Sequence, residues 1–284
     1  MAEGGTRVVV ITGCSTGIGR ATAERLAGRG HTVYATARRL ESIADLEEKG
    51  CKTLSLDVTD EGSMNAAVAA VEQAEGAVGA LVNNAGYSQS GAIEDVPMEQ
   101  VRKQFETNVF GLIRMCQLVL PGMRKQGDGR IVNVSSMGGR LVFPGGGIYH
   151  ATKHAVEALS DALRFEVRGF GVGVSIIEPG LIKTEFGHAA VGSMEGTIAD
   201  DGAYGRFNRE VAAKTAGAYE GSMSRMAAPP DAVARVIQRA IESRRPRPRY
   251  VVTVGARAML LTRRLLPDRG WDAMMRSQFP QPRP

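Results

Sequence analysis

The sequence predicts an α/β protein, a single doubly wound domain whose seven-stranded parallel sheet is covered by helices on both faces. Three observations support this prediction. Short apolar runs alternate with longer amphipathic stretches along most of the 284 residues. A glycine-rich turn follows the first apolar run. No proline-rich linker or repeat interrupts the alternation before Gly180, so residues 1–284 are expected to form one domain.

The strands are expected where short apolar runs read as buried β structure. These runs are residues 8–12, 32–36, 52–56, 80–83, 130–135, 173–178 and 249–253. The stretches between them have the spacing of amphipathic helices. They are residues 18–29, 40–49, 61–74, 100–125, 149–170 and 231–243.

Two later segments depart from this alternation. Residues 186–230 are rich in Gly, Ala, Ser and Met and have no strong period, which predicts a mobile substrate lid of one or two short helices. Residues 255–284 form a basic C-terminal extension whose last 15 residues are expected to trail off. Within it, residues 259–266 could lie on an anionic membrane surface, but we favour a helix packed over the substrate pocket or a neighbouring subunit.

Composition excludes several classes of protein. The hydrophobic content of 43% is too high for a disordered chain, and no apolar run is long enough to span a membrane. Three widely spaced cysteines predict no metal site and fit a reducing, cytoplasmic location. From residue 235 onward the chain has 12 Arg and 3 acidic residues. This tail lacks interleaved aromatic residues and a known reading motif, so no nucleic-acid partner is expected.

A glycine-rich turn at residues 12–19 connects the first strand to the first helix. Its glycines let the backbone approach a pyrophosphate, and the helix N-terminus offers N–H donors. The same residues also match the GxSxG turn of hydrolases, but no acid and histidine follow at later strand ends. We therefore expect a dinucleotide site there that includes Gly13, Ser15, Thr16, Gly17, Ile18 and Gly19.

The end of the second strand indicates which dinucleotide is bound. Folds that prefer NAD place a carboxylate there to bind the ribose 2′-hydroxyl. Here the position holds Ala37, followed by Arg38 and Arg39. A missing carboxylate removes repulsion toward a 2′-phosphate, and a guanidinium offers it a charged fork. NADP(H), bound through Arg38, is therefore favoured over NAD(H).

Several short motifs together resemble the short-chain dehydrogenase/reductase family over residues 6–253. The order and spacing of the motifs carry this resemblance, including 13 residues from Ser136 to Tyr149. They are the glycine-rich turn, Asp57-Val58, Asn83-Asn84-Ala85-Gly86, Asn108, Ser136, Tyr149-x-x-x-Lys153 and Pro179-Gly180. The 17β-hydroxysteroid and retinol dehydrogenase-like branch is the most similar, on residues 14–17, 33–36 and 248–250.

The resemblance implies a Rossmann fold and a role for each matching residue. Asn108, Ser136, Tyr149 and Lys153 would form a catalytic tetrad. The remaining cofactor contacts that it implies are Asp57, Val58, Asn84, Ala85, Gly86, Pro179, Gly180, Ile182 and Thr184, together with Tyr149 and Lys153.

The chemistry of the tetrad follows from its residue types. A tyrosine hydroxyl has an ordinary pKa of about 10, and an adjacent cation lowers it. Tyr149 and Lys153 are four residues apart and would share one face of a helix. Tyr149 would then be the acid and base, and Ser136 would hold the substrate oxygen; Ser135 is the alternative. Asn108 would hold a water that relays protons to Lys153.

The residues after the fifth strand and in the lid are apolar, which favours a lipophilic ketone or secondary alcohol, such as a steroid-, retinoid- or polyketide-like substrate. The residues expected to contact it are Ser136, Met137, Val142, Phe143, Leu181 and Phe186, with Leu141, Met194, Met223 and Met226 nearby. His150 and His154 are read as ordinary helix-face residues. The expected activity is that of an NADP-dependent carbonyl reductase or alcohol dehydrogenase.

Two other functions remain open from the sequence. One is an NADPH-sensing binding protein without turnover, and the other is an NAD-dependent alcohol dehydrogenase. The resemblance also implies a homodimer or homotetramer that pairs through the helices expected at residues 100–125 and 149–170. No metal is expected in the site.

Overall fold

The computed structural model describes residues 5–198, 202–220, 227–279 and 281–282. Its centre is one parallel sheet in the order β3-β2-β1-β4-β5-β6-β7. The strands are β1 (Val8–Ile11), β2 (Thr32–Ala37), β3 (Lys52–Ser55), β4 (Ala80–Asn83), β5 (Gly129–Val134), β6 (Val172–Glu178) and β7 (Arg249–Val251). This confirms the predicted doubly wound, seven-stranded fold.

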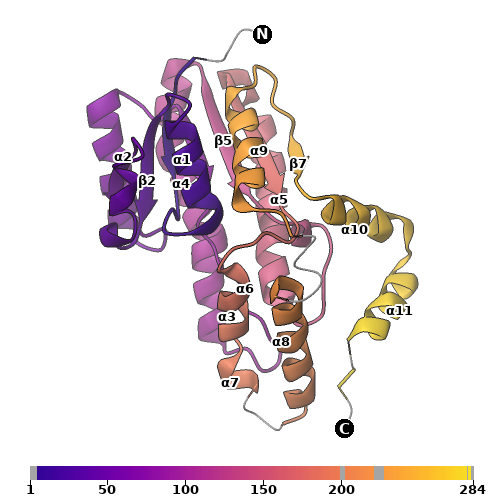
Figure 1. Cartoon of the computed structure of the whole chain (residues 1–284). Coiled ribbons are helices and arrows are strands. Elements are labelled where there is room, and N and C mark those ends of the chain that lie inside the picture. Colours follow the sequence, from indigo (N-terminus) through magenta and orange to yellow (C-terminus); the bar gives the residue numbers. More distant parts are fainter. Residues whose placement is uncertain (1–4, 199–201, 221–226, 280, 283–284) are drawn as a thin grey trace.

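Helices cover the two faces of the sheet (Figure 1). On one face, α1 (Gly17–Ala27) and α9 (Pro230–Glu242) pack on the apolar side chains of β1, β2 and β6. On the other face, α2 (Glu61–Glu75), α4 (Gly111–Gln126) and α5 (Gly147–Val167) bury a second apolar cluster. The strand order reverses between β1 and β4, which opens a crevice at the carboxyl ends of the strands.

Two of the predicted helices differ in the structure. Residues 40–49 form only two short 3-10 turns, Leu40–Ser42 and Ala44–Leu46. Ile43 lies between them with φ −133° and is fully buried, so packing of this side chain overrides the local helix pattern. The helix expected at residues 100–125 is α3 (Met98–Phe105), a π-helical turn at Glu106–Phe110, and α4.

The described part of residues 186–230, the predicted lid, is more helical than expected. It contains α6 (Phe186–Gly192), α7 (Glu195–Ile198) and α8 (Gly205–Glu220) before α9 begins. Met194 does not face a substrate pocket; it is fully buried against Val211 and Ala212. Met223 and Met226 fall outside the described residues.

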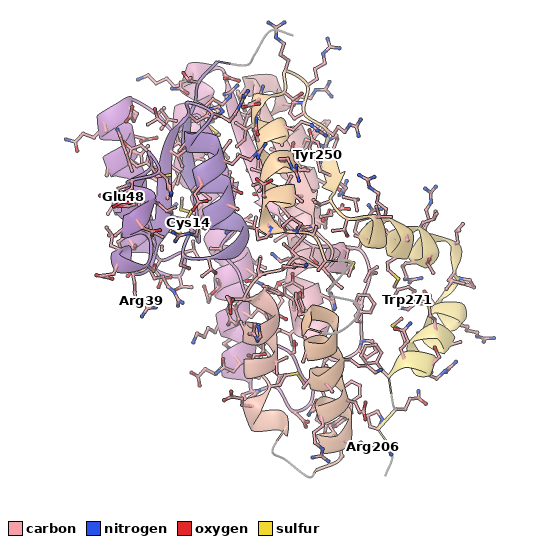
Figure 2. The ribbon with its side chains drawn as sticks, viewed as in Figure 1. Cys14, Arg39, Glu48, Arg206, Tyr250 and Trp271 are labelled. Carbon is pink, nitrogen blue, oxygen red and sulfur yellow. The ribbon has the colours of Figure 1, made fainter. Side chains whose placement is uncertain are left out.

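The C-terminal extension is also more ordered than predicted. It forms α10 (Val254–Leu265) and α11 (Asp268–Gln278), so residues 270–278, expected to trail off, are helical instead. Trp271 and Met275 of α11 are buried against Leu141, and this long-range apolar contact holds the helix in place. Figure 2 shows Trp271 on this outlying pair of helices. Across the described residues, no helix is long and apolar enough to cross a membrane.

Candidate active site

A cavity of about 1440 Å³ lies at the carboxyl ends of the strands. Pockets for single small ligands typically measure about 300–1,000 Å³, so this cavity has room for a dinucleotide and a second molecule. One end, which we call the nucleotide end, is lined by the glycine-rich turn and the ends of β2, β3 and β4. The other, the substrate end, is lined by the segment after β5, by α6 and α8, and by the last residues of α11.

The glycine-rich turn is shaped so that no side chain fills the nucleotide end. Gly13 and Gly17 have positive φ angles of 73° and 61°, which glycine adopts without strain. A Cβ at Gly19 would lie 2.2 Å from the carbonyl oxygen of Gly13, so α1 can approach the turn only with glycine there. Asn84 Nδ2 donates to the carbonyl oxygens of Thr12 and Gly13 at 2.9 Å and fixes the turn.

The N-terminus of α1 is available to an anion. Its N-cap, Thr16, makes no side-chain capping hydrogen bond, and no acidic residue lies in the first turn. The first backbone N–H groups and the positive end of the helix dipole therefore remain for a phosphate. Gly13, Ser15, Thr16, Gly17 and Ile18 all line the cavity, as expected, whereas Gly19 supports them from behind.

The end of β2 lies at the rim of the nucleotide end. Ala37 is the last residue of the strand and Arg38 lines the cavity, whereas Arg39 does not (Figure 2 labels Arg39). The hydroxyl of Tyr87 is buried without a hydrogen-bond partner among the described residues, and Arg38 is close enough to lower its pKa against the larger raising effect of burial. A buried hydroxyl without a partner, in the electrostatic reach of a guanidinium, is suited to an anionic or polar ligand.

Other residues expected to contact the cofactor also line the cavity. Asp57 lines the cavity, and its Oδ1 accepts hydrogen bonds from the backbone N–H and the hydroxyl of Thr59, at 2.9 and 2.8 Å. The other expected cofactor contacts that line the cavity are Val58, Asn84, Ala85, Gly86, Tyr149, Lys153, Pro179, Gly180, Ile182 and Thr184.

Tyr149, Lys153 and Ser136 meet in the middle of the cavity. The first two lie one turn apart on α5, and the Lys153 ammonium is 5.8 Å from the centroid of the Tyr149 ring. Lys153 Nζ also donates to the carbonyl oxygen of Val134 at 2.9 Å. Ser136 hydrogen-bonds Tyr149 and accepts from the N–H of Gly138 at 3.0 Å. A carbonyl oxygen placed between Ser136 and Tyr149 would meet two hydroxyl donors.

Ser135, the alternative to Ser136, also lines the cavity, but its hydroxyl lies beside Gly139. Its hydroxyl has no hydrogen-bond partner among the described residues, and it would lie 2.7 Å from a Cβ built at Gly139. The same Cβ would lie 2.9 Å from Cγ of Glu157. The Tyr149 hydrogen bond to Ser136 therefore favours Ser136 as the substrate-facing hydroxyl.

Asn108 lies one layer behind the cavity, in the π-helical turn that interrupts α3 and α4. Its Nδ2 donates to the carbonyl oxygen of Tyr87 at 3.0 Å and to the Thr152 hydroxyl at 3.1 Å, and its Oδ1 accepts from Tyr87 N–H. A Cβ at Gly86 would be 3.0 Å from this Oδ1 and 3.7 Å from Lys153 Nζ. Single π turns often mark functional sites, and this one places the amide next to the ammonium.

Burial shifts the titration of both central groups. Desolvation raises the pKa of the Tyr149 phenol above its ordinary range, and the Ser136 hydrogen bond opposes that rise. Desolvation also lowers the pKa of Lys153 to about 8, with the Glu157 carboxylate opposing it. A lysine with this pKa is mostly an ammonium at neutral pH but gives up its proton readily. Perturbed groups that meet in one cavity are typical of active sites.

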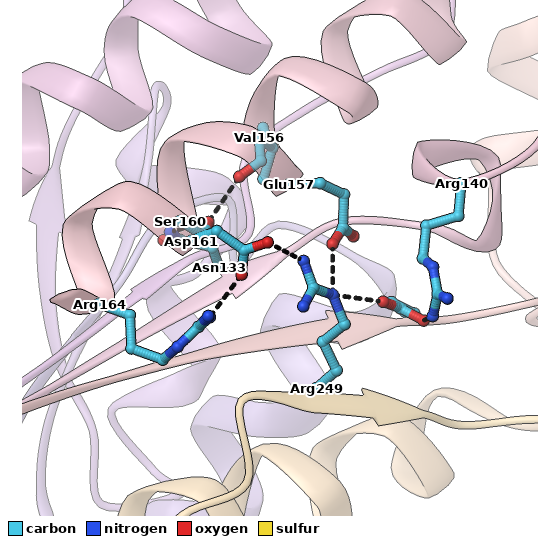
Figure 3. A network of polar contacts seen from close by, with 9 residues as sticks. Asn133, Arg140, Val156, Glu157, Ser160, Asp161, Arg164 and Arg249 are labelled. Atoms are coloured by element: carbon cyan, nitrogen blue, oxygen red, sulfur yellow. Dashed lines mark hydrogen bonds and ion pairs between the residues drawn. The ribbon is translucent and has the colours of Figure 1, made fainter.

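A network of charges surrounds Arg249 (Figure 3). Arg249 Nε is 2.9 Å from Glu157 Oε2 and 3.2 Å from Glu178 Oε1, and its Nη2 donates to Asp161 at 2.5 Å. Arg140 lies 3.3 Å from the other oxygen of Glu178. The network joins β7 and β6 to α5, the helix that carries Tyr149 and Lys153. Sequence reasoning missed it because its members are far apart in the chain.

At the substrate end, most of the expected residues are brought together. Ser136, Met137, Phe143, Leu181 and Phe186 line the cavity, and the Phe186 ring is 5.5 Å from that of Tyr149. Val142 does not contribute: its side chain is 44% exposed, and its carbonyl oxygen accepts a hydrogen bond from Trp271. Leu141 is buried in the cluster around Trp271 instead.

The structure adds cavity residues that the sequence did not indicate. His150 is a buried lining residue rather than a helix-face one; its Nδ1 is 3.0 Å from the Gly138 carbonyl oxygen, and burial lowers its pKa to about 4. Others come from late segments whose proximity depends on tertiary packing. They are Val211, Lys214, Thr215, Ala218, Tyr219, Gln278 and Phe279.

Known proteins share this sequence and geometry. A family model described as short chain dehydrogenase matches residues 7–194. The chain is 36% identical over 282 residues to an uncharacterised oxidoreductase of Bacillus subtilis, covering 96% of this chain and 98% of that protein. It is 37% identical over 276 residues to an NADPH-dependent 3-dehydrocapnine reductase of Ornithobacterium rhinotracheale, covering 94% and 95%.

Solved structures agree with these relatives. A short-chain dehydrogenase from Streptomyces avermitilis has a TM-score of 0.78 and 33% identity, covering 96% of this chain and 95% of that one. A family member from Burkholderia phymatum in complex with NAD has a TM-score of 0.80 and 26% identity, covering 93% and 95%. With the sheet order, the glycine-rich turn and the Tyr149–Lys153 pair in place, the chain belongs to the short-chain dehydrogenase/reductase family and is an oxidoreductase.

Proposed function

We propose that this oxidoreductase is an NADPH-dependent carbonyl reductase, reversible as an alcohol dehydrogenase, with a lipophilic ketone or secondary alcohol as its substrate. The meeting of Tyr149, Lys153 and Ser136 in a cavity with room for two ligands is the observation that carries this proposal. Asn108, held by Tyr87 and Thr152 next to Lys153, completes the proposed tetrad.

The preference for NADPH rests on the end of β2. Ala37 presents no carboxylate to a 2′-phosphate, and Arg38 lines the cavity beside the glycine-rich turn. The reductase from Ornithobacterium rhinotracheale is described as NADPH-dependent, and a serine dehydrogenase structure contains NADP+. The NAD complex from Burkholderia phymatum shows that the fold also accepts the other dinucleotide, so the choice depends on residues such as these.

In the proposed reaction, a nicotinamide cofactor held at the nucleotide end would supply the hydride that reduces the carbonyl carbon. The residues of the chain bind and protonate the carbonyl oxygen of the substrate. Ser136 and Tyr149 hold it by hydrogen bonds, and Tyr149 donates the proton that turns the developing alkoxide into an alcohol. The Lys153 ammonium stabilises the phenolate that remains, and the backbone carbonyl of Val134 keeps the ammonium in position.

The substrate class follows from the lining of the substrate end. Phe143, Leu181 and Phe186 line the same cavity as Ser136 and Tyr149, and the Phe186 ring lies 5.5 Å from that of Tyr149. Burying a side chain of this size against a ligand contributes roughly 1.5–3 kcal/mol, which rewards a bulky apolar substrate. A steroid-, retinoid- or polyketide-like carbonyl fits this description, as the resemblance to the 17β-hydroxysteroid and retinol dehydrogenase branch also suggests.

We further propose assembly into a dimer or tetramer through α4 and α5. Phe165 of α5 is 86% exposed, and Phe110, directly before α4, is 51% exposed. Large exposed apolar side chains can mark protein–protein contacts.

The function is tested by replacing the proposed proton donor. Tyr149→Phe is expected to keep NADPH binding, measured by fluorescence titration, and to lose at least ~100-fold in kcat on a bulky ketone that the parent reduces. Tyr204→Phe is the matched control, because the Tyr204 hydroxyl donates to Glu94 at the surface. Near-normal turnover by Tyr149→Phe would refute the assignment. Tight NADPH binding with no turnover of any ketone by the parent would favour an NADPH sensor.

A further inference from the structure

The C-terminal arm, residues 254–279, starts outside the sheet and ends at the cavity. It comprises α10 and α11, which lie beside the body after β7 (Figure 1). Although α10 leads away, Gln278 and Phe279 line the cavity together with residues of the lid. Residues at the opposite end of the chain from the glycine-rich turn therefore share one cavity with it.

The arm is fixed to the body by an aromatic anchor. Trp271 and Met275 are each 6% exposed and pack on Leu141. The indole N–H of Trp271 donates to the carbonyl oxygen of Val142 at 3.3 Å, and its ring lies 6.2 Å from that of Phe143. Arg263 lies 5.6 Å from the Trp271 ring and also pairs with Asp268 at 2.7 Å. The segment after β5 and the arm thus support each other.

Phe279 connects the end of α11 to α8. Its N–H donates to the carbonyl oxygen of Met275 at 2.9 Å, which fixes it to the end of α11. Its side chain packs on the cluster of Met194, Val211 and Ala212, and Lys214 Nζ lies 5.6 Å from its ring centroid. Val211 and Lys214 also line the cavity. The ring therefore closes the gap between α11 and α8.

We propose that Phe279, positioned by the Trp271 anchor, is a specificity-determining residue that forms the distal wall of the substrate site. This inference rests on the proposed function. Phe186 contacts the Tyr149 ring near the reacting centre, whereas Phe279 lies against α8. A short ketone can reach Tyr149 and Ser136 without touching Phe279, but a bulky apolar substrate extends to it. The arm then selects for substrate size.

The test compares Phe279→Ala and Phe279→Leu with Phe170→Ala as the matched control. Phe170 is 47% exposed beside Arg124 and far from the cavity lining. kcat/KM is measured on a short ketone and on a bulky one. Phe279→Ala is expected to lower the bulky-to-short ratio of kcat/KM about tenfold, the scale of one lost apolar contact. Phe279→Leu should recover most of that ratio, and Phe170→Ala should not change it. NADPH affinity should stay within about twofold in all three variants.

A second readout does not depend on turnover. Trp271 is the single tryptophan of the chain, so its emission reports on the arm alone. With NADPH bound, the aromatic, anionic dye 1-anilinonaphthalene-8-sulfonate is expected to quench Trp271, and Phe279→Ala should weaken dye binding about tenfold.

If Phe279→Ala changes neither the bulky-to-short ratio of kcat/KM nor the dye affinity, Phe279 does not form the distal wall of the substrate site. If the parent turns over no ketone, the proposed function fails and the dye titration alone decides the role of Phe279.

Discussion

The nucleotide end and the substrate end of the cavity are built in different ways. At the nucleotide end the backbone of one short turn meets the ligand, and Gly13, Gly17 and Gly19 leave room for it. At the substrate end the walls are side chains from three separate segments, among them Phe143, Tyr219 and Phe279. A binding site made by the backbone is formed by consecutive residues, whereas a wall of side chains depends on which distant segments pack together.

The largest effect is expected at the junction of the two ends. Lys153→Met should reduce kcat at least ~100-fold, because no ammonium then stabilises the Tyr149 phenolate. The same change should stabilise the fold. The pKa of Lys153 falls from 10.5 to about 8 on folding, so burying its charged form costs up to about 3 kcal/mol below pH 8.

The sign of this effect can be checked by pH. Because the folded pKa is the lower one, the cost is present in full below pH 8 and fades as pH rises toward 10.5. The extra stability of Lys153→Met in urea unfolding should therefore be larger at pH 7 than at pH 10. A margin that grew with pH would contradict the buried ammonium. The hydrogen bond to Val134 that is lost reduces the margin by about 1 kcal/mol.

The next prediction compares the stability effect of a glycine substitution at the nucleotide end of the cavity with one at the substrate end. Gly19→Ala places a Cβ 2.2 Å from the carbonyl oxygen of Gly13 and 2.5 Å from Asn84 Nδ2, so the turn must move. We expect a loss of roughly 1–3 kcal/mol in the free energy of unfolding and weaker cofactor binding. Gly217, within α8, has open space around it, so Gly217→Ala should stabilise by about 0.5–1 kcal/mol. Thermal unfolding measures the stability of both variants. An equal loss of stability in Gly19→Ala and Gly217→Ala would contradict the expected difference between the two sites.

The smallest effect concerns the choice of cofactor. Arg38→Ala should weaken NADPH about tenfold, the scale of one charge-assisted contact, and leave NADH within about twofold. Arg39→Ala is the control, since Arg39 does not line the cavity. Fluorescence titrations of the parent and both variants with NADPH and NADH give the six dissociation constants. Equal weakening of NADPH and NADH by Arg38→Ala would show that Arg38 does not contact the 2′-phosphate.

Much of the fold and of the central site could be predicted from local patterns. The seven strands and the glycine-rich turn follow from short-range periodicity, and Tyr149 and Lys153 meet because four residues make about one helical turn. The 3-10 turns at Leu40–Ser42 and Ala44–Leu46 could not be predicted, because burial of Ile43 decides them. Val142 was expected in the cavity, but its place beside the C-terminal arm turns it outward.

By itself the sequence determined the alternating architecture, the nucleotide-binding turn and the spacing of Ser136, Tyr149 and Lys153, because each depends on neighbours in the chain. Only the tertiary structure decided the π turn that holds Asn108 against Tyr87, the charge network around Arg249, and the return of Phe279 to the cavity. These features depend on contacts between residues more than twenty positions apart, whose free energy no local pattern records.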